Sequence, residues 1–89
     1  MFAQWDEAKA QSNLIKHGVS FEEAATVFED SNAVTFNDDE HSKYEKRLVT
    51  IGYSVQLRML LVVNTDREDN IRIISARKAT TAERKLYEQ

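Results

Sequence analysis

The chain of 89 residues contains no cysteine and no proline, and it has only two glycines. Without cysteine it can form neither a disulfide nor a cysteine-ligated zinc site. Its longest apolar run, Met59–Val63, is far shorter than the roughly 20 residues that a membrane-spanning helix needs. The N-terminus also lacks the basic and apolar segments of a signal sequence. We therefore expect a soluble, cytoplasmic protein without a membrane partner.

Length and composition predict one folded domain over residues 1–89. Hydrophobic residues make up 42% of the chain and charged residues 30%, which is typical of a globular protein rather than a disordered one. A chain of this length buries about 60–65% of the surface of its unfolded state, so the core is adequate but small.

The charges divide the chain into two opposite halves. Residues 1–42 hold two basic and nine acidic side chains, a balance of −7, whereas residues 43–89 hold ten basic and six acidic ones, a balance of +4. Because the net charge is −3, any contact with nucleic acid must be local and made by the second half. The alternative interpretation is that the two halves attract each other across the fold.

The first part of the chain predicts a short strand and two helices. Residues 2–5 suit a strand, and Asp6 can cap a helix that runs to about residue 16 and ends at Gly18. Ser20 and Glu23 form a capping box for a second helix. Its apolar stripe has helical spacing and consists of Phe21, Ala24, Ala25 and Phe28.

From Ala33 onward the pattern predicts strands, which we expect at residues 33–37, 47–54, 58–65 and 70–76. Short connections favour antiparallel hairpins, and the continuously apolar third segment suits a central strand. A last helix begins near Thr81. The expected fold class is α+β, with the order β-α-α-β-β-β-β-α and helices packed on an antiparallel sheet.

The start of the last helix gathers cations. Thr80 and Glu83 form a capping box, and Arg77 and Lys78 precede it at the end of a strand. A phosphate there would meet both cations and the free backbone N–H groups of the helix. The alternative is a pair that only bonds the acidic half.

Arg72 lies in the strand that leads to this helix, among isoleucines. Unbroken alternation predicts that it shares a face with Ile74 and Ala76, where it is either paired or in a cleft.

Three segments, KHGVSFEEAATVF, HSKYEKR running into LVTIGYS, and IRIISARKATTAERKLYE, together resemble the BrnT family, the toxin half of bacterial type II toxin–antitoxin pairs. The similarity covers nearly the whole chain. It implies a RelE-like fold, ribonuclease activity that inhibits translation, and a hetero-oligomer with a neutralising BrnA-like antitoxin. The other part of such an antitoxin is a ribbon-helix-helix domain, and only through it would operator DNA be contacted. Asn64 stands where such proteins often have a histidine, so any proton transfer by that histidine is not available here.

RNA cleavage without a metal needs a base for the 2′-hydroxyl proton, an acid for the leaving 5′-oxygen and cations around the phosphate. The catalytic candidates are His41, Glu45, Arg47, Arg72, Arg77 and Tyr87. The candidates for binding RNA phosphate are Arg67, Arg77, Lys78 and Arg84. Each has a simpler alternative: His41 solvated or contacting the antitoxin, Glu45 only orienting Arg47, and Tyr87 packing on the sheet.

We predict neither a metal nor a cofactor. The acidic stretch Asp38–His41 lacks the ligand spacing of zinc or calcium motifs, and His17 suits the end of a helix without a further role. The alternative function is a non-enzymatic or degenerate module that only binds an antitoxin or a DNA-binding partner.

Overall fold

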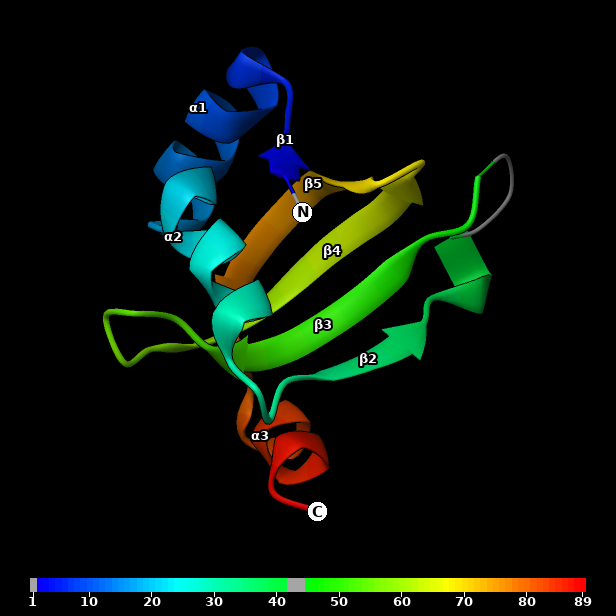
Figure 1. Cartoon of the computed structure of the whole chain (residues 1–89). Coiled ribbons are helices and arrows are strands. Elements are labelled where there is room, and N and C mark those ends of the chain that lie inside the picture. The colour runs from blue at the N-terminus through cyan, green and yellow to red at the C-terminus, as the bar shows by residue number, and fades with distance from the viewer. Residues whose placement is uncertain (1, 42–44) are drawn as a thin grey trace.

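The computed structural model describes residues 2–41 and 45–89, without the side chains of Phe2 and His41, and contains one five-stranded sheet (Figure 1). Its strands are β1 (Phe2–Gln4), β2 (Val34–Asn37), β3 (Leu48–Tyr53), β4 (Met59–Arg67) and β5 (Asn70–Lys78). The α-helices are α1 (Glu7–His17), α2 (Phe21–Thr26) and α3 (Thr81–Tyr87). Two 3₁₀ helices are η1 (Val27–Glu29) and η2 (Asp39–His41). None of the described helices has the length and apolar character needed to cross a membrane.

The sheet is mixed, with the strand order β1-β5-β4-β3-β2. Strands β2 to β5 pair in antiparallel fashion, but β1 runs parallel to β5. The α+β class is confirmed, whereas the expected antiparallel sheet is wrong, and the two 3₁₀ helices interrupt the predicted order. A tight hairpin enforces antiparallel pairing only between consecutive strands, and β1 meets a strand far away in the sequence.

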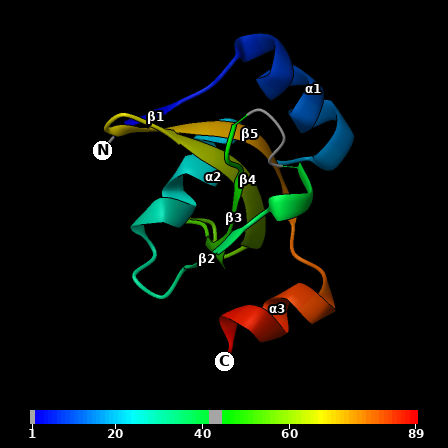
Figure 2. The same cartoon turned by 90° about the vertical axis from the view of Figure 1, so that its right-hand side faces the viewer.

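The two faces of the sheet are covered unequally. Helices α1 and α2 lie on one face, while α3 lies apart from them at one end of the sheet (Figures 1 and 2). The main core fills the space under α1 and α2 with residues from α2, its flanks, β4 and β5: Val19, Phe21, Ala24, Val27, Leu60, Val62, Ile73 and Ala76. A smaller cluster of Ile51, Met59 and Leu61 lies on the other face, with Tyr87 of α3 packed against it.

A register shift interrupts the pairing of β4 with β5. Val63 lies opposite Ser75, whereas the next residue, Asn64, lies opposite Ile73, so Ile74 is an extra residue in β5. This is the geometry of a β-bulge, which adds one residue to one strand and locally changes which way its side chains point.

The bulge changes the predicted face of Arg72. Opposing residues of an antiparallel pair point to the same face, and here Arg72 lies opposite Thr65 while Arg77 lies opposite Leu61. Since Leu61 and Thr65 are an even number of residues apart on β4, both arginines lie on the face away from α1 and α2. The sequence placed Arg72 on one face with Ile74 and Ala76. For Ala76 this prediction is wrong, because the extra residue, Ile74, shifts the alternation.

A buried asparagine attaches α1 to β5. Strand β1 pairs only with residues 70–72, and beyond it the Asn13 side chain takes the place of a neighbouring strand. Its Oδ1 accepts a hydrogen bond from the Ala76 N–H at 3.1 Å, and its Nδ2 donates to the Ala76 carbonyl at 2.8 Å. Nδ2 also donates to the Val19 carbonyl at 3.0 Å. One side chain therefore fixes the helix, the turn after it and the strand edge.

The capping box expected at the start of α2 forms only in part. The Ser20 hydroxyl accepts from the Glu23 N–H, as predicted, but the Glu23 carboxylate does not return to Ser20. It is buried, accepts from the Ser54 hydroxyl at 2.7 Å and forms an ion pair with Arg58. The Arg58 guanidinium lowers the pKa of Glu23 and also donates to the Gly18 carbonyl. Arg58 thus joins the β3–β4 hairpin to the turn between α1 and α2.

Replacement of Asn13 by alanine should destabilise the protein by roughly 1–3 kcal/mol, because it leaves buried backbone groups of Ala76 without their partner. Urea unfolding measures the effect. Ser12→Ala is the matched control, since Ser12 is exposed on the same helix and gains similar helix propensity. Equal stability of the two variants would contradict the anchoring role.

Candidate functional site

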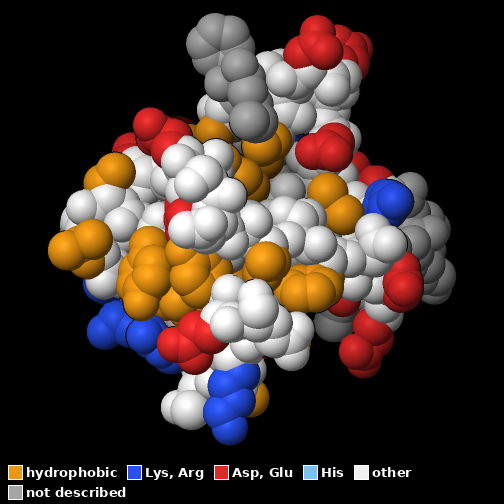
Figure 3. Space-filling model, turned by 60° about the horizontal axis from the view of Figure 1, so that its bottom comes forward, with side chains coloured by type: hydrophobic (Ala, Val, Ile, Leu, Met, Phe, Trp, Pro, Cys, Tyr) orange, Lys and Arg blue, Asp and Glu red, His pale blue; other side chains and the backbone are white. Residues whose placement is uncertain are grey.

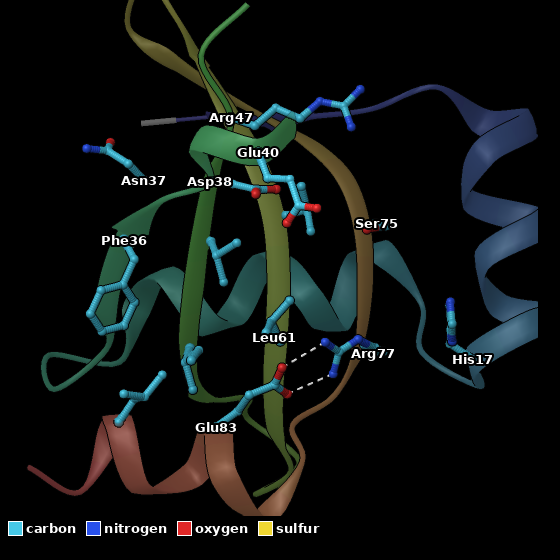
Figure 4. Close-up of a pocket in the computed structure, with 14 residues that line it drawn as sticks. His17, Phe36, Asn37, Asp38, Glu40, Arg47, Leu61, Ser75, Arg77 and Glu83 are labelled. Carbon is cyan, nitrogen blue, oxygen red and sulfur yellow. Dashed lines mark hydrogen bonds and ion pairs between the residues drawn. The ribbon is translucent and has the colours of Figure 1, made fainter. Parts of the chain in front are cut away.

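The face of the sheet away from α1 and α2 carries a groove of about 680 Å³ (Figure 4). Strands β3 and β4 supply an apolar floor made of Val49, Ile51, Leu61 and Val63. Helix α3 borders the groove at one end and η2 at the other (Figure 4). The groove is open because α3 covers only part of this face.

Two arginines lie at opposite ends of the groove. Arg47, just before β3, lies at the η2 end, and Arg77, from β5, lies near α3 (Figure 4). The structure thus brings together two of the predicted cations, which are 30 residues apart in the sequence.

Arg77 forms a bidentate ion pair with Glu83. Its Nη1 and Nη2 each donate to one carboxylate oxygen at 2.8 Å, and Nη1 also donates to the Lys78 carbonyl at 3.2 Å. Glu83 also accepts from the Thr80 N–H at 2.8 Å, which completes the predicted capping box. The hydrogen bonds from Arg77 are the main reason why the pKa of Glu83 falls to about 2.

The phosphate site expected at the start of α3 does not form as predicted. Lys78 lies opposite Leu60 and Arg77 opposite Leu61, so the two neighbouring side chains point to opposite faces of the sheet. The Glu83 carboxylate accepts hydrogen bonds from the Thr80 N–H at the start of the helix and from two N–H groups of Arg77. One phosphate cannot meet both cations and the free N–H groups together, and only Arg77 of this pair lines the groove.

Tyr87 packs on the sheet, which was the simpler alternative. Its hydroxyl donates to the Asp30 carboxylate at 2.9 Å, and its ring meets that of Tyr53 edge to face with centroids 5.4 Å apart. Desolvation, together with Asp30, raises the pKa of Tyr87. Arg84 of the same helix donates to the Tyr53 hydroxyl at 3.3 Å. These contacts attach α3 to η1 and β3.

Of the other predicted site residues, those with a described side chain lie outside the groove lining. Glu45 and Arg67 form an exposed ion pair at 3.2 Å. Arg72 shares the open face but lies opposite Thr65, beyond the groove. His41 ends η2, and its side chain lies outside the part of the chain that the structure describes.

Several residues of the groove were not among the catalytic or phosphate-binding residues predicted from the sequence. His17 reaches it from the end of α1, Phe36 from the edge strand β2 and Leu86 from α3, while Asp38 and Glu40 come from the acidic stretch. An aromatic residue in a predicted edge strand was the available signal for Phe36. Seen from the side of α3, hydrophobic side chains reach the surface in patches near Lys and Arg side chains (Figure 3). Among the described residues, no group of three acidic or histidine side chains comes close enough together to hold a metal ion.

Comparison with known proteins identifies the family. Residues 5–83 match the family described as ribonuclease toxin, BrnT, of type II toxin-antitoxin system. The chain belongs to the BrnT family. A crystal structure of the Brucella abortus ribonuclease toxin, BrnT, is similar, with a TM-score of 0.67 and 27% sequence identity over 91% of this chain and all of that chain. Comparison with curated proteins gave no match. The resemblance to BrnT toxins seen in the sequence is confirmed.

The Arg77–Glu83 pair predicts how the stability of this BrnT protein depends on pH. The pKa of Glu83 is about 2 in the folded protein against 4.5 ordinarily. The pair therefore stabilises the fold fully above about pH 4.5, and its contribution disappears as the pH falls towards 2. Glu83→Gln should unfold at lower urea concentration than wild type at neutral pH, with a difference that shrinks as the pH falls through this window.

Glu22→Gln, at an exposed position of α2, is the control and should show a smaller difference throughout. A Glu83→Gln effect of the same size at neutral and at strongly acidic pH would show that the ion pair is not its cause.

Proposed function

We propose that this protein is an endoribonuclease toxin that cleaves mRNA without a metal ion and so inhibits translation. The observation that supports the proposal is the groove on the open face of the sheet. In a member of a ribonuclease toxin family, it combines arginines at both ends with an imidazole at its rim.

The two arginines, at opposite ends of the groove, would each hold a phosphate of the RNA, and one of the two phosphates would be the scissile one, on which charge develops. Guanidinium groups bind phosphate oxygens through fixed pairs of N–H donors and keep their charge at any physiological pH. The hydrogen bonds from Arg77 to Glu83 and to the Lys78 carbonyl use both N–H groups of Nη1 and one of Nη2. Nε–H and one Nη2–H therefore remain for a ligand, on a side chain that Glu83 already holds in place.

Proton transfer would fall to histidine. A base removes the 2′-hydroxyl proton as O2′ attacks phosphorus, and an acid protonates O5′ as the P–O5′ bond breaks. His17 lines the groove, and an imidazole can serve both as a base and as an acid. His41 remains a candidate from the sequence alone. These groups, with the arginines, supply what a metal would otherwise provide.

The remaining candidates have secondary roles in this proposal. Arg67, Arg72 and Arg84 would contact flanking phosphates, because they lie outside the groove. Lys78 points to the other face, and Glu45 and Tyr87 have partners within the fold, so we assign them no part in the chemistry.

The proposed partner is a BrnA-like antitoxin with a ribbon-helix-helix domain, which alone would contact operator DNA. We place the hetero-oligomer in the cytoplasm, with residues 1–89 acting as one toxin domain related to the RelE-like fold. The second candidate function, a module that only docks the antitoxin, would use the same groove without cleaving RNA.

The purified toxin should cleave RNA in excess EDTA. Arg47→Ala and His17→Gln should each lower the cleavage rate by at least about tenfold, since each removes a phosphate contact or a proton-transfer group. Cleavage of labelled RNA measures the rates. Lys85→Ala is the control, because Lys85 is exposed on α3 and does not line the groove.

Activity that appears only after magnesium is added would exclude the cation-only mechanism. Absence of cleavage under any condition, with tight antitoxin binding, would favour the docking module instead.

Antitoxin binding should be slower at high salt. The basic second half of the toxin, with its balance of +4, would attract an acidic and partly apolar antitoxin segment. Screening acts over roughly 10 Å at 0.1 M salt, so stopped-flow association rates at low and high ionic strength measure the effect. A rate that does not change with salt, together with RNA binding by the assembled complex, would show that the antitoxin binds elsewhere.

A further inference from the structure

The groove has a lining that a phosphate chain alone does not explain. Beside its arginines it carries three carboxylates, Asp38, Glu40 and Glu83. Glu83 is bonded to Arg77 near α3, and Asp38 and Glu40 lie at the η2 end, where Glu40 points towards the groove (Figure 4). Carboxylates repel phosphates and accept hydrogen bonds from amino groups. A ligand with both phosphates and amino groups would suit this mixture.

The groove also has apolar walls that face water. Phe36 of β2 is 42% exposed and Leu86 of α3 is 38% exposed, and both border the apolar floor. Phe36 lies opposite Val49 on the edge of the sheet, so its ring rests on a rigid element. Exposed aromatic rings on such sheets are the surfaces on which unpaired nucleobases stack, because every base has a flat π-face.

We propose that the groove binds one unpaired nucleobase of a single-stranded RNA, stacked on Phe36, with Glu40 accepting a hydrogen bond from the amino group of that base. The inference rests on the proposed function and specifies its substrate. A volume of about 680 Å³ lies within the roughly 300–1,000 Å³ of small-molecule sites, which suits a single nucleotide. Arg47 and Arg77 lie where the phosphates on either side of the base would run.

The Glu40 contact implies a preference among bases. Adenine, cytosine and guanine carry exocyclic amino groups that donate to a carboxylate, whereas uracil presents carbonyl oxygens at the corresponding positions. RNA with an amino-bearing base in the groove should therefore bind more tightly than RNA made only of uridine.

Binding of 2′-O-methyl oligonucleotides separates recognition from cleavage, because the blocked 2′-oxygen cannot attack. Fluorescence anisotropy would compare labelled oligo(A) and oligo(C) with oligo(U). Phe36→Ala and Phe36→Leu should weaken oligo(A) binding about tenfold, whereas Phe36→Trp should retain it. Phe36→Leu keeps an apolar side chain, so its loss of binding reports the aromatic face rather than folding.

Two further variants complete the test. Leu57→Ala, at an 82% exposed position on the β3–β4 hairpin, should bind like wild type. Glu40→Gln should reduce the discrimination against oligo(U), because an amide can also donate to a uracil carbonyl.

Unchanged oligonucleotide binding by Phe36→Ala and Phe36→Leu, with a wild-type toxin that cleaves RNA, would overturn the base site and leave the proposed function intact. The same two variants losing antitoxin binding while keeping oligonucleotide binding would also overturn it, and would make this edge a protein-docking surface. Conversely, the expected binding pattern with a wild type that never cleaves RNA would overturn the enzymatic function and retain the base site.

Discussion

Strand β5 is bonded along both of its edges, and the rest of the molecule depends on this constraint. Strand β4 pairs with one edge of β5. Strand β1 pairs with the first part of the other edge, and the Asn13 side chain bonds to this edge further along, at Ala76. A strand fixed in this way cannot rotate, so each of its side chains is committed to one face. Ala76 goes to the core under the helices, and Arg77 goes to the groove. The bulge at Ile74 adds Arg72 to the groove side, which an unbroken strand would not do.

The end of the groove near α3 is as well fixed as the core. The capping box, the Arg77–Glu83 pair and the bond from Tyr87 to Asp30 all attach a helix of seven residues that is too short to be stable alone. Arg77 therefore holds α3 in place, and Glu83 in turn holds the Arg77 guanidinium in one orientation. Its partial neutralisation by Glu83 reduces the attraction for a distant phosphate but removes the entropy cost of ordering the guanidinium on binding. Hydrogen-bond donors that are already fixed in place stabilise the charge of a transition state better than a mobile charged side chain does, because they need not reorganise.

Features set by neighbouring residues could be predicted from the sequence, whereas features set by contacts between distant residues could not. The caps at Asp6, Ser20 and Thr80 follow from side chains that bond backbone N–H groups two or three residues away. The parallel β1 and the bulge depend on partners distant in the sequence. Gly52 lies in a correctly predicted strand, yet a Cβ there would come within 2.9 Å of the Ala33 Cβ, a constraint that only packing reveals. In the site, charge predicted Arg47 and Arg77, whereas His17 and Phe36 enter because α1 and β2 end beside the groove.

The opposite charges of the two halves of the chain attract each other across the fold at least in part, which is one of the two roles that the sequence left open. The Glu23–Arg58 pair joins an acid of the first half to a base of the second, so some of the charge holds the fold together. The pairs Arg77–Glu83 and Arg67–Glu45 instead join acids and bases that both belong to the second half. Asp38 and Glu40 are acids of the first half, and they border the groove together with Arg47 of the second half. The groove thus lies where the halves meet, with carboxylates, arginines and apolar side chains within one cavity. A nucleotide has a complementary part for each of the three: an amino-bearing edge for the carboxylates, a phosphate for the arginines and a flat face for the apolar side chains. A bare phosphate complements only the arginines.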